Sequence, residues 1–279
     1  MTAVTTRQRL ISLLLVSAPE IYLSLVVPVR NGADRLAVHL EMLRAFVCAQ
    51  ARPAELVLVD DHSEPTAAQI LADFGRDAAA ESGGNGGDGG EGGRVTLLRN
   101  EEHRGKGFSV ARGIRAARGR YRVFTDADLA YPVEEIAKIV RDLETGSDVA
   151  IACRVLPESR YVMSPSFFHY LYTRHVMSRV FNRMVRVVLL PGILDTQAGL
   201  KGFTARAGEL IFSRLTVPGF GFDVECLYIA RKHRLTIRQT AVRYRYDDEP
   251  STVRFAADAA EMLRDLVKIR WNDWRGRYA

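Results

Sequence analysis

The stretch Tyr121-Arg122-Val123-Phe124-Thr125-Asp126-Ala127-Asp128 joins a short apolar run to two carboxylates placed two residues apart. Its first five residues have the β-branched and aromatic character of a buried strand. Side chains two residues apart project to the same side of an extended chain, so Asp126 and Asp128 can share one hard divalent cation, with phosphate oxygens completing its shell. An acidic pair in a surface turn is the simpler alternative, and the rest of the sequence has to decide between the two.

Short β-rich runs alternate with longer helical runs on both sides of this strand. We expect strands at 22–27, 55–59, 95–98, 122–125 and 148–152, and helices at 33–48, from 66 onward, at 108–117 and at 133–143. This alternation predicts an α/β fold with a Rossmann-like, mostly parallel sheet flanked by helices. Ligands of such sheets bind beyond the carboxyl ends of the strands.

Polar residues follow four of these strands, and we expect them to converge on one crevice. They are Pro28 to Asn31, Asp60 to Ser63, Asn100 to Lys106 and Asp126 to Asp128. The tract from Ser82 to Gly93 formally contains G-x-G-x-x-G, but no strand precedes the pattern and no helix follows it. We therefore interpret this tract as a flexible surface loop and not as a dinucleotide site.

Composition is consistent with a globular protein that handles anions. The 279 residues are 47% hydrophobic, enough for one large α/β domain or two small ones. The odd set Cys48, Cys153 and Cys226 lacks metal-ligand spacing, which favours a reducing compartment and hence the cytoplasm. A formal net charge of +6 suits nucleotide diphosphates, lipid phosphates or an acidic membrane surface, although charge alone does not exclude nucleic acid.

Near the N-terminus, an apolar run extends from Leu10 to Ala18, and Arg7 and Arg9 precede it. The run is too short to span a bilayer, which takes about 20 residues. Because the first core strand begins almost at once after it, we interpret residues 1–20 as an amphipathic lead-in and not as a cleaved signal.

With these residues in place, the chain resembles the inverting glycosyltransferases of family two, which have the GT-A fold. The matching segments are Val26 to Asn31, Leu58 to Ser63, Asn100 to Gly113 and Phe124 to Asp128. The resemblance implies that Lys106 approaches the donor diphosphate and that Asp126 and Asp128 hold Mg²⁺ or Mn²⁺. It also implies a donor site formed by Pro28, Arg30, Asn31, Asp60, Asp61, Lys106, Asp126 and Asp195.

The second half of the chain narrows this resemblance. Ala152 to Arg154, Asp195 to Phe203 and Gly221 to Glu225 are similar to dolichyl-phosphate β-glucosyltransferases and to bacterial polyprenyl-phosphate glycosyltransferases. The resemblance implies transfer of a hexose, with glucose from UDP-glucose favoured, to a polyprenyl or dolichyl phosphate, and no nucleic-acid partner. It implies a nucleotide-sugar half at 21–155 and an acceptor half of the same domain at 156–253.

Two basic amphipathic segments support a lipid-phosphate acceptor. Arg179, Arg183 and Arg186 lie at i, i+4 and i+7, so a helix places these cations on one face beside apolar residues. A helix that buries one side and solvates its arginines is an equally acceptable interpretation. The tail at 254–279 mixes tryptophan, aliphatic and basic residues and fits a membrane interface, a core-packing helix or a homodimer contact. We expect a peripheral enzyme at the inner, cytoplasmic face of the membrane.

The expected chemistry is an in-line displacement at the anomeric carbon, with Asp128, Arg154 and Asp223 as catalytic residues. Arg154 and one or more of Arg174, Arg179 and Arg183 would orient the acceptor phosphate. A phosphate is already an anion and needs little or no general base, whereas a hydroxyl acceptor, the alternative substrate, would need Asp223 as base. Asp223 is also compatible with a helix N-cap contact or an ion pair with a nearby arginine, and Asp195 with a loop-holding role.

Overall fold

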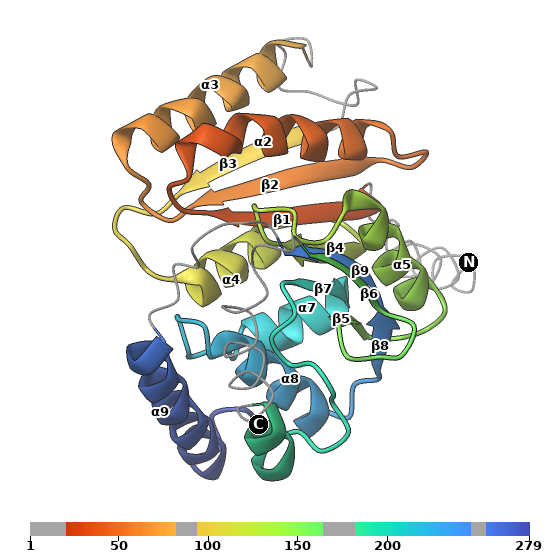
Figure 1. The fold of residues 1–279 in the computed structure, drawn as a ribbon, viewed down its shortest axis with the longest axis vertical. Helices are drawn as coiled ribbons and strands as arrows, with labels where there is room; N and C mark the ends of the chain where they lie inside the picture. The colour runs from red at the N-terminus through yellow and green to blue at the C-terminus, as the bar shows by residue number, and fades with distance from the viewer. Residues whose placement is uncertain (1–20, 82–93, 164–181, 247–254) are drawn as a thin grey trace, which may run out of the picture.

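The computed structural model describes residues 21–81, 94–163, 182–246 and 255–279 (Figure 1). The predicted lead-in at 1–20, the glycine tract, Arg174 and Arg179 lie outside these residues. In the first half the predicted alternation is confirmed. Strands β1 (Leu23–Val29), β2 (Ala54–Asp60), β3 (Arg94–Arg99), β4 (Tyr121–Thr125) and β5 (Val149–Cys153) alternate with helices α2 (Ala33–Cys48), α3 (Pro65–Glu81), α4 (Lys106–Ala116) and α5 (Val133–Glu144).

The second half completes the same sheet. Its elements are β6 (Arg160–Met163), β7 (Leu200–Thr204), α7 (Ala205–Phe212), α8 (Phe222–Lys232), β8 (Ile237–Ala241), β9 (Arg243–Tyr246) and α9 (Phe255–Trp274). The seven-stranded sheet of the described chain has the order β3-β2-β1-β4-β7-β5-β8, and β6 and β9 form a separate parallel pair. Only β7 runs antiparallel to its neighbours β4 and β5, so the mostly parallel α/β fold is confirmed.

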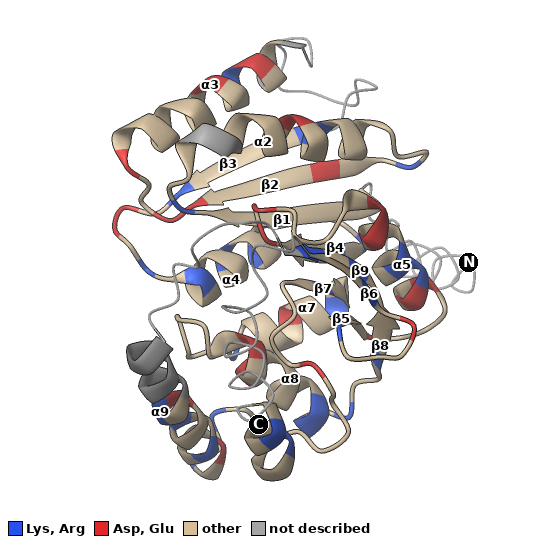
Figure 2. Cartoon of the chain, in the orientation of Figure 1, with Lys and Arg blue, Asp and Glu red and all other residues tan. Residues whose placement is uncertain are grey.

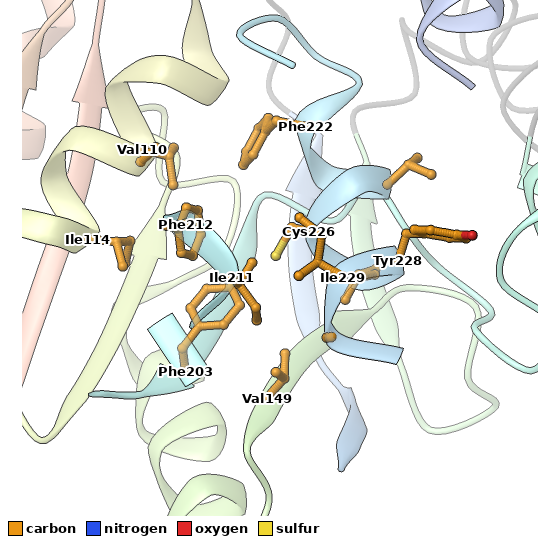
Figure 3. Close-up of a cluster of buried hydrophobic side chains, with 14 of the residues drawn as sticks. Val110, Ile114, Val149, Phe203, Ile211, Phe212, Phe222, Cys226, Tyr228 and Ile229 are labelled. Carbon is orange, nitrogen blue, oxygen red and sulfur yellow. The ribbon is translucent and has the colours of Figure 1, made fainter. Parts of the chain in front are cut away.

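Two hydrophobic cores cover the two faces of the sheet. Alternation along β1 sends Leu25 and Val27 into the core beneath α2, α3 and α5, and sends Val26 into the core beneath α4, α7 and α8. Figure 3 shows Phe203, Phe212 and other side chains of the core beneath α4, α7 and α8. Each such fully buried side chain contributes about 2 kcal/mol, so this core holds α4 and α8 firmly on the sheet.

Close packing of α4 on β1 brings the start of that helix to the carboxyl edge of the sheet. A Cβ at Gly113 would lie 2.3 Å from Val26 Cγ1, so only glycine allows the helix to approach this closely. As a result, Lys106, the first residue of α4, lies at the edge where β4 ends. Within the described ranges, no helix combines the length and the apolar character needed to cross a bilayer.

Candidate functional site

The paired carboxylates after β4 meet a lysine from α4. Lys106 Nζ lies 2.6 Å from Asp126 Oδ1, while Asp128 Oδ1 accepts a hydrogen bond of 3.0 Å from the Ala130 amide. Desolvation and the charge of Asp126 raise the pKa of the Asp128 carboxyl. Burial acts to lower the pKa of Lys106, but Asp126 and Asp223 outweigh it and raise the pKa, so Lys106 is a cation at neutral pH.

The loop before β7 packs against Asp126. The Asp126 amide donates a hydrogen bond of 3.1 Å to the Gly199 carbonyl, and a Cβ at position 199 would lie only 1.9 Å from Asp126 Oδ2. Any side chain at Gly199 would therefore displace the carboxylate. The antiparallel strand β7 thus fixes the position of the first acidic residue.

A buried ion pair adjoins this cluster. The side chain of Lys201 is fully buried, and its Nζ donates hydrogen bonds to Asp223 Oδ1 and to the Ala198 carbonyl. Asp223 is the second residue of α8 and is 3% exposed. Burial raises the pKa of Asp223, and the charges of Lys201 and Lys106 oppose this shift without cancelling it. The ion pair predicted for Asp223 is therefore present, but its partner is Lys201 and not an arginine.

The charge and the donor set of this cluster fit a divalent cation. Asp126, Asp128 and Asp223 carry three negative charges when ionised, and Lys106 and Lys201 carry two positive ones. The described residues contain no group of three or more acidic, histidine or cysteine side chains placed to hold a metal by themselves. Mg²⁺ is commonly held by one or two carboxylates together with substrate phosphates and water, which is what Asp126 and Asp128 offer.

Arg154, which follows β5, is oriented by Asp195. Its Nε and Nη2 donate to the two carboxylate oxygens at 2.7 and 2.9 Å, and its backbone amide donates to Oδ2 at 3.0 Å. Burial acts to raise the pKa of Asp195, but Arg154 outweighs it and lowers the pKa. The loop-holding role of Asp195 is therefore present in the structure, and its contact with the donor sugar stays a prediction.

The residues predicted to bind the nucleoside support one another at the ends of β1 and β2. Asp61 accepts hydrogen bonds from Asn100 Nδ2 at 2.8 Å and from the Arg104 and Gly105 amides at 2.9 Å. Burial acts to raise the pKa of Asp61, but these hydrogen bonds outweigh it and lower the pKa. His103 Nδ1 also contacts Asp61 at 2.7 Å, and its Nε2 contacts Arg30. Asp61 therefore shapes the loop before α4.

The neighbouring turns are joined in a similar way. Asp60 Oδ1 accepts a hydrogen bond of 2.9 Å from the Ser63 amide, and Asn31 Oδ1 accepts one of 2.8 Å from the Glu64 amide. Pro28 lies close by, inside β1. The structure thus brings the predicted donor residues to one edge of the sheet, while their contacts with a nucleoside stay a prediction.

On the acceptor side the structure describes only part of the predicted arginine set. Residues 182–188 are helical, and Arg183 is exposed on this helix. Asn182 anchors the helix through its contact with the Leu194 carbonyl, next to Asp195. The role of Arg183 in binding the acceptor phosphate stays a prediction.

The sequence did not reveal that Gly199, Lys201 and Glu225 support the site. Glu225 is fully buried and accepts hydrogen bonds from the Thr216 and Val217 amides and from the Tyr278 hydroxyl. The signal for Lys201 was a lone cation within the apolar segment Leu200 to Phe203. Its partner was not identifiable before β7 and α8 were placed side by side.

Comparison with known proteins identifies the relatives of this chain. Human dolichyl-phosphate beta-glucosyltransferase is 31% identical over 91% of this chain and 76% of the relative. The enzyme of the same name from Mus musculus is 32% identical over 91% of this chain and 76% of the relative. The enzyme of that name from Dictyostelium discoideum is 29% identical over 90% of this chain and 75% of the relative. The predicted resemblance to these enzymes is confirmed.

Solved structures support the GT-A fold. Glucosyl-3-phosphoglycerate synthase from Mycobacterium tuberculosis in complex with UDP has a TM-score of 0.61 at 19% identity, covering 89% of this chain and 80% of that one. The complex of the same enzyme with Mn²⁺, UDP and glucosyl-3-phosphoglycerate has a TM-score of 0.56 at 17% identity over the same shares. Residues 24–205 match the family model of Glycosyl transferase family 2. The chain therefore belongs to glycosyl transferase family 2 and is a glycosyltransferase.

Proposed function

We propose that the enzyme transfers a hexose from a nucleotide sugar, with UDP-glucose as the favoured donor, to a polyprenyl or dolichyl phosphate, using Mg²⁺ or Mn²⁺. The observation that carries the proposal is the Lys106 and Asp126 pair beside Asp128 at the carboxyl edge of the sheet. The names of the relatives support the acceptor and the sugar. Such an acceptor lies in a bilayer, which favours a peripheral enzyme, and the odd set of three cysteines favours the inner, cytoplasmic face.

The residues of this cluster suit a reaction in which negative charge moves onto a leaving diphosphate. A divalent cation held by Asp126 and Asp128 would neutralise that charge, an effect worth several kcal/mol. Lys106 would donate to the same diphosphate from the start of α4. Arg154, held rigidly by Asp195, would orient the acceptor phosphate and reduce its repulsion from the donor.

Asp223 has a positioning role in this proposal. Its ion pair with the buried Lys201 holds a negative charge close to Lys106 and so helps to fix that lysine at the donor site. A phosphate acceptor attacks through an oxygen that is already ionised, and no base is needed.

The second candidate keeps the donor site but uses a hydroxyl acceptor. The observation that favours it is the raised pKa of Asp223, because a general base works best when its pKa lies close to the working pH. In that reaction Asp223 would take the hydroxyl proton of a saccharide or small molecule.

Nucleotide release distinguishes the two candidates. UDP- and GDP-sugars would be tested with Mg²⁺ or Mn²⁺, with and without a short polyprenyl phosphate in detergent, and with a panel of hydroxyl acceptors. We expect release that requires the lipid phosphate and that is lost in Asp126→Asn, while the control Glu134→Gln, an exposed carboxylate on α5, retains it. Release that responds to hydroxyl acceptors and not to lipid would contradict the proposal.

A further inference from the structure

The outward face of α9 carries a continuous apolar stripe. Leu263, Val267, Trp271 and Trp274 are 47%, 71%, 51% and 78% exposed. Their spacing of four, four and three residues places them along one side of the helix. The centres of the two tryptophan rings lie 5.3 Å apart, and Val267, Trp271 and Trp274 line a shallow depression of about 340 Å³ together with Arg270. Scattered exposed apolar residues are ordinary, but an ordered stripe with two tryptophans indicates an interaction surface.

The opposite face of α9 is firmly attached to the enzyme. Leu266 and Ile269 are 6% and 0% exposed within the core beneath α8. A Cβ at Gly221 would lie 2.3 Å from Asp265 Oδ2, so α9 packs directly on the start of α8. The outward stripe thus lies on the side of α9 away from the start of α8, the helix that carries Asp223.

Cations surround the stripe. Exposed basic residues of the same segment are Arg264, Lys268, Arg270, Arg275 and Arg277, and Figure 2 shows basic residues along the described part of α9. The Arg275 guanidinium lies 4.9 Å from the centre of the Trp271 ring. The acidic Asp273 is engaged with Lys232 and Tyr228. The surface therefore offers tryptophan and aliphatic side chains within a positively charged rim.

We propose that the stripe formed by Leu263, Val267, Trp271 and Trp274 is the surface by which the enzyme docks on an anionic bilayer. Tryptophan prefers the interfacial region of a membrane, and the rim of cations matches anionic head groups. A second copy of this chain is a poorer occupant, because a two-fold contact would bring two identical basic rims together. The inference rests on the proposed function for the choice of a membrane as the partner, because the proposed acceptor is a lipid phosphate. The stripe would be the surface that brings the enzyme to that acceptor.

The chain contains only two tryptophans, both in the stripe, so tryptophan fluorescence excited at a wavelength that the ten tyrosines do not absorb reports on this surface alone. The protein would be titrated with vesicles of phosphatidylcholine, with and without phosphatidylglycerol, in the absence of donor and acceptor. We expect a blue shift that is stronger with the anionic lipid, and quenching by lipids brominated on the acyl chain. A spectrum that does not respond to either vesicle would overturn the proposal.

Paired substitutions localise the effect. Leu263→Gln with Val267→Gln keeps both tryptophans as reporters and should weaken vesicle binding at least tenfold. The matched control is Val38→Gln with Met42→Gln on α2, an exposed apolar pair at the same spacing, 63% and 41% exposed, at the other end of the molecule in Figure 1. The control should bind vesicles as the parent does, and an equal loss in both variants would contradict the assignment of the surface.

Three further measurements distinguish membrane docking from self-association and from a defect in catalysis. A blue shift without vesicles that grows with protein concentration, together with a dimer in analytical ultracentrifugation that is lost in Leu263→Gln with Val267→Gln, would assign the stripe to a second copy and overturn the proposal. Nucleotide release with the short lipid phosphate in detergent should be unchanged in the same variant. Failure of docking is therefore distinguishable from failure of the proposed transfer reaction.

Discussion

Gly199 is the residue on which the position of Asp126 depends most closely. A Cβ at this position would lie 1.9 Å from Asp126 Oδ2, so Gly199→Ala should push the carboxylate away while leaving the core intact. We expect the metal-dependent affinity for a UDP-sugar to fall about tenfold, equivalent to about 1.4 kcal/mol. Isothermal titration with Mn²⁺ present measures this affinity.

The control is Gly75→Ala in α3, where the nearest atoms would be 3.9 Å from the new Cβ. This change should leave donor binding unaltered and should stabilise the helix by up to about 1 kcal/mol, because glycine is a poor helix former. Equal donor binding by both alanine variants would show that Gly199 does not position Asp126.

Asp195 gives a prediction for stability against pH. Its pKa is lowered by Arg154, so its contribution to folding is fully present above the pKa of the unfolded chain, about 3.9, and is lost as the pH falls through the lower folded pKa. Asp195→Asn should lower the free energy of unfolding at pH 7 by about 3 kcal/mol, near the low end for a buried pair because Arg154 keeps some contact with water.

Urea unfolding of the parent and of Asp195→Asn between pH 7 and pH 3 provides the measurement. The difference between the two proteins should shrink as the pH falls below about 4, where Asp195 of the unfolded chain begins to be protonated while the folded carboxylate is still ionised. A difference that stays constant across this range would mean that the charge of Asp195 does not stabilise the fold.

At the residue scale, the sequence predicted the charged groups at the carboxyl edge of the sheet and missed the residues that hold them in place. Asp126, Asp128 and Lys106 were recognisable because strand ends and short spacings are local features of the chain. Gly199 and Lys201 act through contacts with Asp126 and Asp223. Those contacts exist only because β7 lies between β4 and β5, which no local pattern reveals.

At the scale of elements, the junction of β7 with α8 controls the ionisation of Asp223. Lys201 acts to lower the pKa of Asp223, so Lys201→Met should raise that pKa further and let the carboxyl take up a proton at higher pH. We expect the acidic limb of the profile of kcat/KM against pH to move to higher pH.

Lys232→Met is the control, because it makes the same change on α8 at a partly exposed lysine that pairs with Asp273. This variant should keep the parental profile. An unchanged profile in Lys201→Met would show that the ionisation of Asp223 does not matter for turnover, and a change confined to the thermal unfolding temperature would make the buried pair purely structural.

The elements of the first half were predictable because their hydrophobic periods and strand lengths are typical of alternating α/β units. The helix predicted at 33–48 matches α2, and the strand predicted at 122–125 falls within β4. The direction of β7 and the separate pairing of β6 with β9 were not predictable, since an antiparallel insertion has the same local pattern as a parallel strand.

At the scale of the whole molecule, ligand binding should stabilise the fold through linkage. A UDP-sugar with Mn²⁺ at 100 times its dissociation constant should add about 2.7 kcal/mol to the free energy of unfolding. The stabilisation should be lost in Asp126→Asn and retained in Glu134→Gln. Thermal unfolding with and without both ligands measures it, and full stabilisation of Asp126→Asn would place the donor elsewhere.

The most direct measurement is the structure of the lipid product. The enzyme would be incubated with UDP-glucose, Mn²⁺ and a short polyprenyl phosphate, and the lipid would be examined by mass spectrometry and by NMR of the anomeric proton. We predict a polyprenyl phosphate that has gained one hexose in the β configuration, because a single in-line displacement inverts the α-linked donor. UDP release without a glycosylated lipid, or an α-linked product, would contradict the proposed transfer.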